Sequence, residues 1–437
     1  MQFRKTLGFL FSSNVLVAVL SVFLGVATAR ILGVEGRGEF YLFVQTVSLG
    51  TTFLAFGLQS SFQYFLSKQI MPKSDIIGMI ILQLAFSTII LSVALALTKT
   101  YLVQWFSIDD DFLYAAFICV VLGISVLFFN SVMMTFSRGV KWTSILAVVS
   151  SALQLVLFLI FVLLLPDEIG AISCAIIAFS MAYFIRSVAS LSVIRDFKFK
   201  IKKKYISDFK ILYKFGAASF LANISVLLLF KVDIFMIQSE LGYHQLGIYS
   251  AAVTIAEMVL LFPTVVGTAL FAHLPNLALP ARISLVRKTL LGVSVLSALA
   301  LVVLFISGQM ILNILFGKSF SGSIQPLLYL LPGLFFMSLN YCFANYFSGV
   351  GMPKITGYIF SFGVLTNVLL NFYLIPKYGI AGAAIASSLA YLQVLLSFLW
   401  AFKRFENVSI QDLLTISKDE IKFIKRLVMS KWRGLFQ

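Results

Sequence analysis

The chain has 437 residues, of which 60% are hydrophobic and only 11% are charged. Soluble proteins average about 45–50% apolar and about 25% charged residues, so this composition excludes an ordinary soluble domain and predicts an all-α polytopic membrane protein. The net charge of +16 does not require a nucleic-acid partner, because membrane proteins concentrate Lys and Arg in cytoplasmic loops.

Twelve apolar stretches are long enough to cross a bilayer, which takes about 20 helical residues. The first, at the N-terminus, exceeds the apolar core of a cleaved signal peptide and is interpreted as an uncleaved helix. Turn signals such as residues 33–38 (GVEGRG), 166–168 (PDE) and 376–379 (PKYG) separate the stretches. The predicted spans are 7–31, 40–66, 76–98, 112–136, 143–165, 169–194, 211–237, 246–272, 287–315, 324–348, 355–375 and 379–402.

A weak internal repeat divides these spans into two halves. Leu32-Gly33 is followed by Gly38 and Phe40, and Leu241-Gly242 is followed at the same spacing by Gly247 and Tyr249, an offset of 209 residues. Six spans per half give both halves the same orientation, as in transporters whose two bundles enclose a cavity. We predict a first bundle over 1–194, a basic cytoplasmic linker over 195–210, a second bundle over 211–402 and a basic tail over 403–437, for which an amphipathic surface helix is expected.

Basic residues indicate the orientation of the spans. With the N-terminus inside, the inner segments hold 26 of the 33 Lys and Arg residues and the outer segments hold 5. Both termini are therefore expected in the cytoplasm. The densest basic segment, 195–214, falls between spans six and seven and is expected to lie on anionic membrane lipids.

Polar side chains inside the spans are the candidate functional residues, because a charge at the centre of such a helix costs at least about 2.5 kcal/mol. Asp233 on span seven, Asn367 and Asn371 on span eleven and Ser387 on span twelve fall at one depth of the second bundle. A carboxylate with amide and hydroxyl oxygens suits Na⁺ or a proton, so these residues are predicted to bind a coupling cation, with Na⁺ at Asp233. Ordinary hydrogen bonding between helices is an equally reasonable interpretation.

A second set of candidates is charged: Arg30, Arg186, Lys231 and Glu257. Arginines that present paired donors suit an anionic, phosphate-bearing substrate. Arg30 also fits an arginine that reaches the outer headgroups, and Lys231 and Glu257 also fit an internal ion pair.

Nothing in the sequence indicates an enzyme or a cofactor. A phosphate-binding loop is missing, which excludes ATP hydrolysis by this chain. His244 and His273 have no nearby partner ligands for a metal, and the three cysteines lie in apolar stretches as packing residues.

Four segments carry a resemblance to a known family: 29–40 (ARILGVEGRGEF), 232–237 (VDIFMI), 246–252 (LGIYSAA) and 367–387 (NVLLNFYLIPKYGIAGAAIAS). In order and spacing they resemble the Wzx-type polysaccharide flippases, in the superfamily that includes the lipid II flippase and the MATE drug exporters. The resemblance implies a V-shaped, two-lobed transporter of the bacterial inner membrane that works by alternating access. It implies an undecaprenyl-pyrophosphate-linked oligosaccharide as cargo, Arg30 as a cavity residue, and a sodium site at Asp233, Asn367, Asn371 and Ser387.

The resemblance also implies membrane lipids and the polysaccharide polymerase machinery as partners, in O-antigen, capsule or exopolysaccharide synthesis. The alternative is a MATE-type cation-coupled drug exporter, against which the basic residues Arg186 and Lys231 argue. A membrane-embedded glycosyltransferase would need long outer loops with catalytic groups, which this sequence lacks.

Overall fold

The computed structural model describes residues 2–106, 109–136, 139–165, 170–194, 205–274 and 277–406. All regular structure in these residues is helical, which confirms the predicted all-α class. The expected linker (195–210) and tail (403–437) lie outside the described residues, apart from 205–210, which begin α7, and 403–406, which continue α11.

Within the described residues, nine helices are long and apolar enough to cross a membrane. Three of them have 54 residues each: α1 (Gln2–Ala55), α7 (Tyr205–Met258) and α11 (Pro353–Glu406). Such a helix would extend about 80 Å if it were straight, more than twice the roughly 30 Å apolar layer. Counting each of their limbs as one crossing gives the twelve predicted spans.

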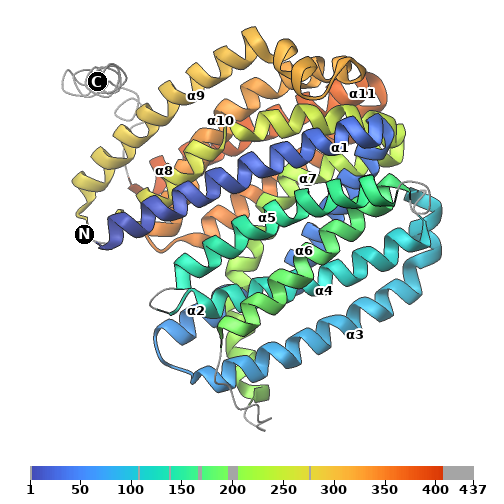
Figure 1. The fold of residues 1–437 in the computed structure, drawn as a ribbon. Coiled ribbons are helices and arrows are strands. Elements are labelled where there is room, and N and C mark those ends of the chain that lie inside the picture. Colours follow the sequence, from blue (N-terminus) through green and yellow to red (C-terminus); the bar gives the residue numbers. More distant parts are fainter. Residues whose placement is uncertain are drawn as a thin grey trace, which may run out of the picture.

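The remaining helices complete the bundle. In chain order they are α2 (Leu58–Ser67), α3 (Lys73–Phe106), α4 (Asp110–Met133), α5 (Gly139–Leu164), α6 (Ala171–Val193), α8 (Leu261–His273), α9 (Leu279–Leu315), η2 (Lys318–Ser323) and α10 (Ile324–Gly349). We call α1–α6 the first lobe and α7–α11 the second lobe (Figure 1).

A single glycine bends each long helix. Gly33, Gly242 and Gly379 have φ values of 71°, 79° and 59° with extended ψ. Only glycine adopts this backbone conformation without strain. The turns predicted over 33–38 and 376–379 were therefore too long: helical geometry resumes directly after Gly33, and Pro376 lies inside α11, because one glycine suffices to redirect the chain.

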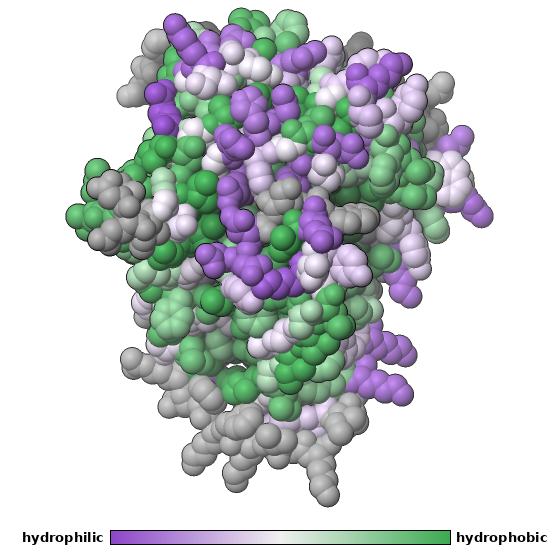
Figure 2. Space-filling model, turned by 90° about the vertical axis from the view of Figure 1, so that its right-hand side faces the viewer, coloured by the Kyte–Doolittle hydropathy of each residue, from purple (hydrophilic) through white to green (hydrophobic). Residues whose placement is uncertain are grey.

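The three bends lie together at one end of the bundle, which we call the kink end (Figure 1). The opposite end, where α1 begins and α11 finishes, is the terminal end. Figure 2 views the kink end and shows hydrophilic side chains over its middle and upper part, with hydrophobic ones mainly to the left of and below them. This distribution fits a helix bundle whose end meets water and whose sides meet lipid.

The repeat predicted from the sequence relates the two lobes at the kink end. A Cβ atom on Gly38 would overlap the carbonyl oxygen of Tyr243, and a Cβ on Gly247 would overlap that of Val34. Val34 and Tyr243 are themselves 209 residues apart, so the two contacts are equivalent under the repeat. Close backbone packing through glycine thus joins α1 to α7 on both sides of a pseudo-twofold axis.

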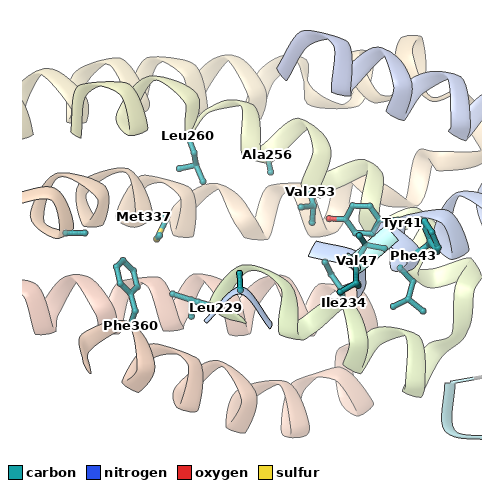
Figure 3. Close-up of a cluster of buried hydrophobic side chains, with 14 of the residues drawn as sticks. Tyr41, Phe43, Val47, Leu229, Ile234, Val253, Ala256, Leu260, Met337 and Phe360 are labelled. Atoms are coloured by element: carbon teal, nitrogen blue, oxygen red, sulfur yellow. The ribbon is translucent and has the colours of Figure 1, made fainter. Parts of the chain in front are cut away.

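Apolar side chains fill the junction of the long helices. Figure 3 shows part of this core, in which Tyr41, Phe43 and Val47 of α1 lie in one cluster with Ile234 and Val253 of α7. All five are buried. Because the second limb of α1 is fixed against α7, the polar residues on the same limbs are held in register.

Candidate functional site

A cavity of about 520 Å³ lies between the lobes and is lined by α1, α5 and α6 from the first lobe and α7 and α8 from the second. We call it the cationic cavity, because its described lining contains three basic residues, Arg37, Arg186 and Lys231, and one acid, Glu257. Its lining therefore carries a net charge of +2, and its volume falls within the roughly 300–1,000 Å³ of small-molecule sites.

Arg37 lies on the second limb of α1, one turn after the Gly33 bend, and is only 5% exposed. Its Nη1 donates to Thr28 Oγ1 at 2.8 Å and its Nη2 to Thr254 Oγ1 at 3.2 Å, so it joins both limbs of α1 to α7. Its Nε is buried and has no hydrogen-bond partner within the described part of the chain. A buried guanidinium held by two neutral hydroxyls keeps its charge uncompensated.

Lys231 forms an ion pair with Glu257 across the limbs of α7, with 2.8 Å between Nζ and Oε1. This is the internal pair that the sequence allowed. The lysine side chain is 12% exposed and the glutamate 40%. Tyr41 lies between the charges, with its ring centroid 5.5 Å from the Arg37 guanidinium carbon and 6.0 Å from Lys231 Nζ. The aromatic face stabilises both cations.

Arg186 reaches the same cavity from α6. Its Nε is buried without a partner among the described residues, as is the hydroxyl of Tyr41. Arg37, Arg186 and Tyr41 therefore each leave an N–H or O–H donor unsatisfied at this site. Buried donors without acceptors are costly, and an anion that enters the cavity would satisfy them.

The four predicted cation-site residues are brought together inside the second lobe, and all are buried. Ser387 Oγ donates to Asp233 Oδ2 at 3.3 Å. Asn367 Nδ2 donates to Ser387 Oγ at 3.2 Å, and Asn371 Nδ2 donates to Asn367 Oδ1 at 2.9 Å. Tyr249, which the sequence analysis did not include, donates to Asp233 Oδ2 at 2.5 Å. We call these five residues the Asp233 cluster.

The Asp233 cluster leaves oxygens rather than N–H groups unsatisfied. Asp233 Oδ1 and Asn371 Oδ1 are buried and lack a partner within the described residues. A hard cation prefers carboxylate and amide oxygens, so these atoms fit a small cation. The cluster contains one acid, and nowhere in the described chain do three His, Cys, Asp or Glu residues form a group that would hold a metal.

Arg30, the first candidate for the cavity, lies elsewhere in this structure. It is exposed and donates to the last carbonyls of α9, Nε to Leu315 at 2.9 Å and Nη2 to Ile314 at 2.5 Å. It is not among the residues that line the cationic cavity. A cation suits this place, because the last carbonyls of a helix lack intrahelical partners and carry the negative end of its dipole.

Arg37 is the cavity residue that the sequence analysis missed. It was counted with the outer loop, because the glycines around it predicted a turn. Only the single-residue bend at Gly33 turns the following helix back and brings Arg37 inside. The repeat carried the signal: at an offset of 209 residues, Arg37 is equivalent to Leu246, which is the first residue of the predicted span 246–272.

The chain matches, over residues 3–276, the family described as "Polysaccharide biosynthesis protein". This match covers more than half of the sequence. The chain belongs to the polysaccharide biosynthesis protein family.

Two relatives extend this assignment. An uncharacterized membrane protein of Methanocaldococcus jannaschii is 24% identical over 405 residues, 87% of this chain and 93% of that protein. A Shigella flexneri protein named "Putative O-antigen transporter" is 26% identical over 229 residues, 52% of this chain and 53% of its own length. This member of the polysaccharide biosynthesis protein family is thus similar to an uncharacterized membrane protein over most of its length and to a putative O-antigen transporter over about half of it.

Solved structures share its fold. The lipid II flippase MurJ in an inward closed conformation superposes with a TM-score of 0.75 at 16% identity and covers 96% of this chain and 92% of that one. An inward-facing MATE multidrug transporter gives 0.69 at 15% identity, over 89% and 94%. The predicted fold, like that of MATE proteins and the lipid II flippase, is confirmed.

Proposed function

We propose that the protein is a flippase that moves a lipid-linked oligosaccharide, carried on undecaprenyl pyrophosphate, across a bacterial inner membrane. The observation that carries the proposal is the cationic cavity. Arg37, Arg186 and Lys231 line it, and the Nε–H group of each arginine has no acceptor among the residues that the structure describes. A diphosphate that leaves water for the membrane interior needs such partners, because an unpaired buried charge is far too costly.

In this mechanism the two arginines bind the phosphate oxygens through paired donors. Lys231 adds a third charge, and Glu257 keeps Lys231 compensated while the cavity is empty. We extend the cargo-binding role to Arg37, whereas Arg30 holds the end of α9 in this conformation. Alternating access would rock the lobes about the cavity and break the glycine contacts of the kink end when that end opens.

The Asp233 cluster is proposed to couple this motion to Na⁺ or H⁺. Asp233 Oδ1 and Asn371 Oδ1 would hold the ion, with Asn367 and Ser387 fixing their orientation. Lys231 and Asp233 are two residues apart on α7, so a shift of this limb reaches both sites. No other cofactor is needed.

We also propose the orientation. Both termini would face the cytoplasm, so the kink end would face the periplasm, where the polymerase machinery consumes the delivered units. Reporters fused within 195–214 and after Lys403 should give cytoplasmic signals, and one near Asp110 a periplasmic signal. A periplasmic signal from the 195–214 fusion would contradict this topology.

The decisive experiment deletes the gene and follows the lipid-linked repeat units. They should accumulate in the cytoplasmic leaflet and disappear again when the wild-type protein is restored. Arg37→Ala and Arg186→Ala, at matched protein levels, should fail to restore export. Normal export in the deletion strain combined with lost efflux of cationic drugs would instead establish the MATE-type alternative, which the net positive cavity disfavours.

A further inference from the structure

A second, larger cavity of about 870 Å³ adjoins the cationic cavity on its terminal side. The two cavities share Lys231 and Glu257 in their linings. From this pair the larger cavity runs past the first limb of α1 and α2 to α10 and the start of α11. A ligand that fills both cavities would therefore pass the ion pair.

The larger cavity differs from its neighbour in charge. Lys231 and Glu257 are the charged residues in its described lining, and they neutralise each other. The more exposed partner is the carboxylate, at 40% against 12% for the lysine. No unpaired cation among the described lining residues faces a ligand here, so the local field is neutral to negative.

Side-chain amides replace the charges. Four line this cavity, each from a different helix: Asn14 of α1, Gln59 of α2, Asn223 of α7 and Asn345 of α10. We call it the amide cavity. An amide offers two N–H donors and a carbonyl acceptor, which is the mixture that sugar hydroxyl and acetamido groups require.

The amides differ in how firmly they are held and how accessible they are. Asn345 Nδ2 donates to the carbonyl oxygen of Tyr341 at 2.8 Å, and it packs so closely on Gly267 that a Cβ atom there would lie 2.5 Å from Nδ2. Gln59 Oε1 is buried without a hydrogen-bond partner in the described structure. Asn223 is exposed within the cavity. The cavity therefore combines a fixed amide, an unsatisfied acceptor and a freely accessible amide.

We propose that the amide cavity holds the sugars of the cargo and selects neutral over acidic sugars. The inference rests on the proposed function and adds the class of oligosaccharide to it. Neutral sugars exchange hydrogen bonds with water for hydrogen bonds with the amides at little net cost. An acidic sugar loses its hydration without gaining a cation, and it meets the carboxylate of Glu257.

Binding to the purified full chain in lipid nanodiscs tests the inference with three probes. These are undecaprenyl diphosphate alone, the same lipid with N,N′-diacetylchitobiose, and the same lipid with a disaccharide of equal size that contains a hexuronic acid. The neutral disaccharide should tighten binding at least about tenfold over the lipid alone, which corresponds to 1.4 kcal/mol. Equal or tighter binding of the hexuronic acid probe would overturn the inference.

Variants then locate the selectivity. Asn223→Ala and Asn345→Ala should each reduce binding of the neutral probe toward that of undecaprenyl diphosphate alone. Asn223→Arg should admit the hexuronic acid probe, because it supplies the missing cation. Asn313→Ala is the matched control, since Asn313 is an exposed amide of α9 outside both cavities and should behave as the wild type.

The outcomes separate the two proposals. If undecaprenyl diphosphate binds and the attached sugars make no difference, the sugar inference fails and the flippase proposal stands. If a chain that elutes as a single species binds none of the three lipids, both fail. Because Asn223 is exposed and Asn345 is packed, a folding defect in one variant leaves the other as the test.

Discussion

The two lobes share a backbone design and differ in what their interiors hold. Phe40 and Tyr249 occupy equivalent places in the repeat and both are buried. Phe40 packs on Phe43, with ring centroids 6.4 Å apart, whereas the Tyr249 hydroxyl donates to Asp233. The first lobe is therefore apolar where the second carries the Asp233 cluster. The bends and the close glycine contacts are thus repeated in both lobes, while the side chains at equivalent positions differ.

The cationic cavity and the Asp233 cluster differ in which buried polar atoms lack a hydrogen-bond partner. Within the described residues, the groups without a partner in the cationic cavity are donors on Arg37, Arg186 and Tyr41. In the Asp233 cluster they are acceptor oxygens on Asp233 and Asn371. Free donors are satisfied by an anion and free acceptors by a cation. The comparison thus supports our proposal that the cargo phosphates bind at the interface between the lobes and that a coupling ion binds inside the second lobe.

The largest effect is expected when two arginines of α1, Arg37 and Arg30, are each replaced and the losses of export are compared. Arg37→Ala should lower export of lipid-linked units about 100-fold, because it removes charge-assisted hydrogen bonds of about 1.5–3 kcal/mol at a buried phosphate site. Arg30→Ala should cost less than about tenfold, since Arg30 only satisfies carbonyls at the end of α9. Export is measured at matched expression. A larger loss of export in Arg30→Ala than in Arg37→Ala would support the original expectation that Arg30 binds the cargo.

The next largest loss of export is expected when the glycine contacts between the lobes are disturbed. Gly38→Ala and Gly247→Ala should each reduce export roughly tenfold, since forced overpacking costs about 1–3 kcal/mol and here the obstacle is backbone. The equivalence of the two contacts predicts similar losses. Gly292→Ala on α9 is the control, because a Cβ atom there has open space. Wild-type export by both kink-end variants would show that the lobes do not need this close approach.

A smaller effect is expected from the coupling site. Asp233→Asn keeps the size of the side chain and should remove the stimulation of export by a Na⁺ or H⁺ gradient, on the order of fivefold. Export without a gradient should persist. The measurement is transport in proteoliposomes with each gradient imposed separately. If gradient stimulation is unchanged, Asp233 is only a hydrogen-bond partner within the second lobe.

The smallest effect is expected from a substitution that makes the second lobe resemble the first at one position. Tyr249→Phe deletes the hydroxyl that donates to Asp233 and should reduce the free energy of unfolding by about 1 kcal/mol, because one buried hydrogen bond is lost. It should also weaken the response to the coupling ion about twofold. Phe40→Tyr in the first lobe is the reciprocal variant and should leave that response unchanged. An equal response in both variants would remove the functional difference between the lobes.

Much of the fold was accessible from the sequence. The number of spans and the common depth of Asp233, Asn367, Asn371 and Ser387 were predicted from distance along the chain, because a bilayer fixes how many residues each crossing takes. The meeting of these four residues was expected on that ground, and the structure places them in hydrogen-bond contact. Tyr249 was missed, because a tyrosine in an apolar span has no distinct signal.

The charges at the lobe interface were decided only by tertiary structure. From the sequence alone, Arg30 at the end of a span was a better cavity candidate than Arg37 in an apparent loop. One glycine bend turned Arg37 into the cavity and left Arg30 beside α9. The depth of a residue in the membrane depends on its position along a span, which composition and spacing indicate. Which side of a helix faces a neighbour depends on backbone angles and packing between distant segments, and local sequence does not record these.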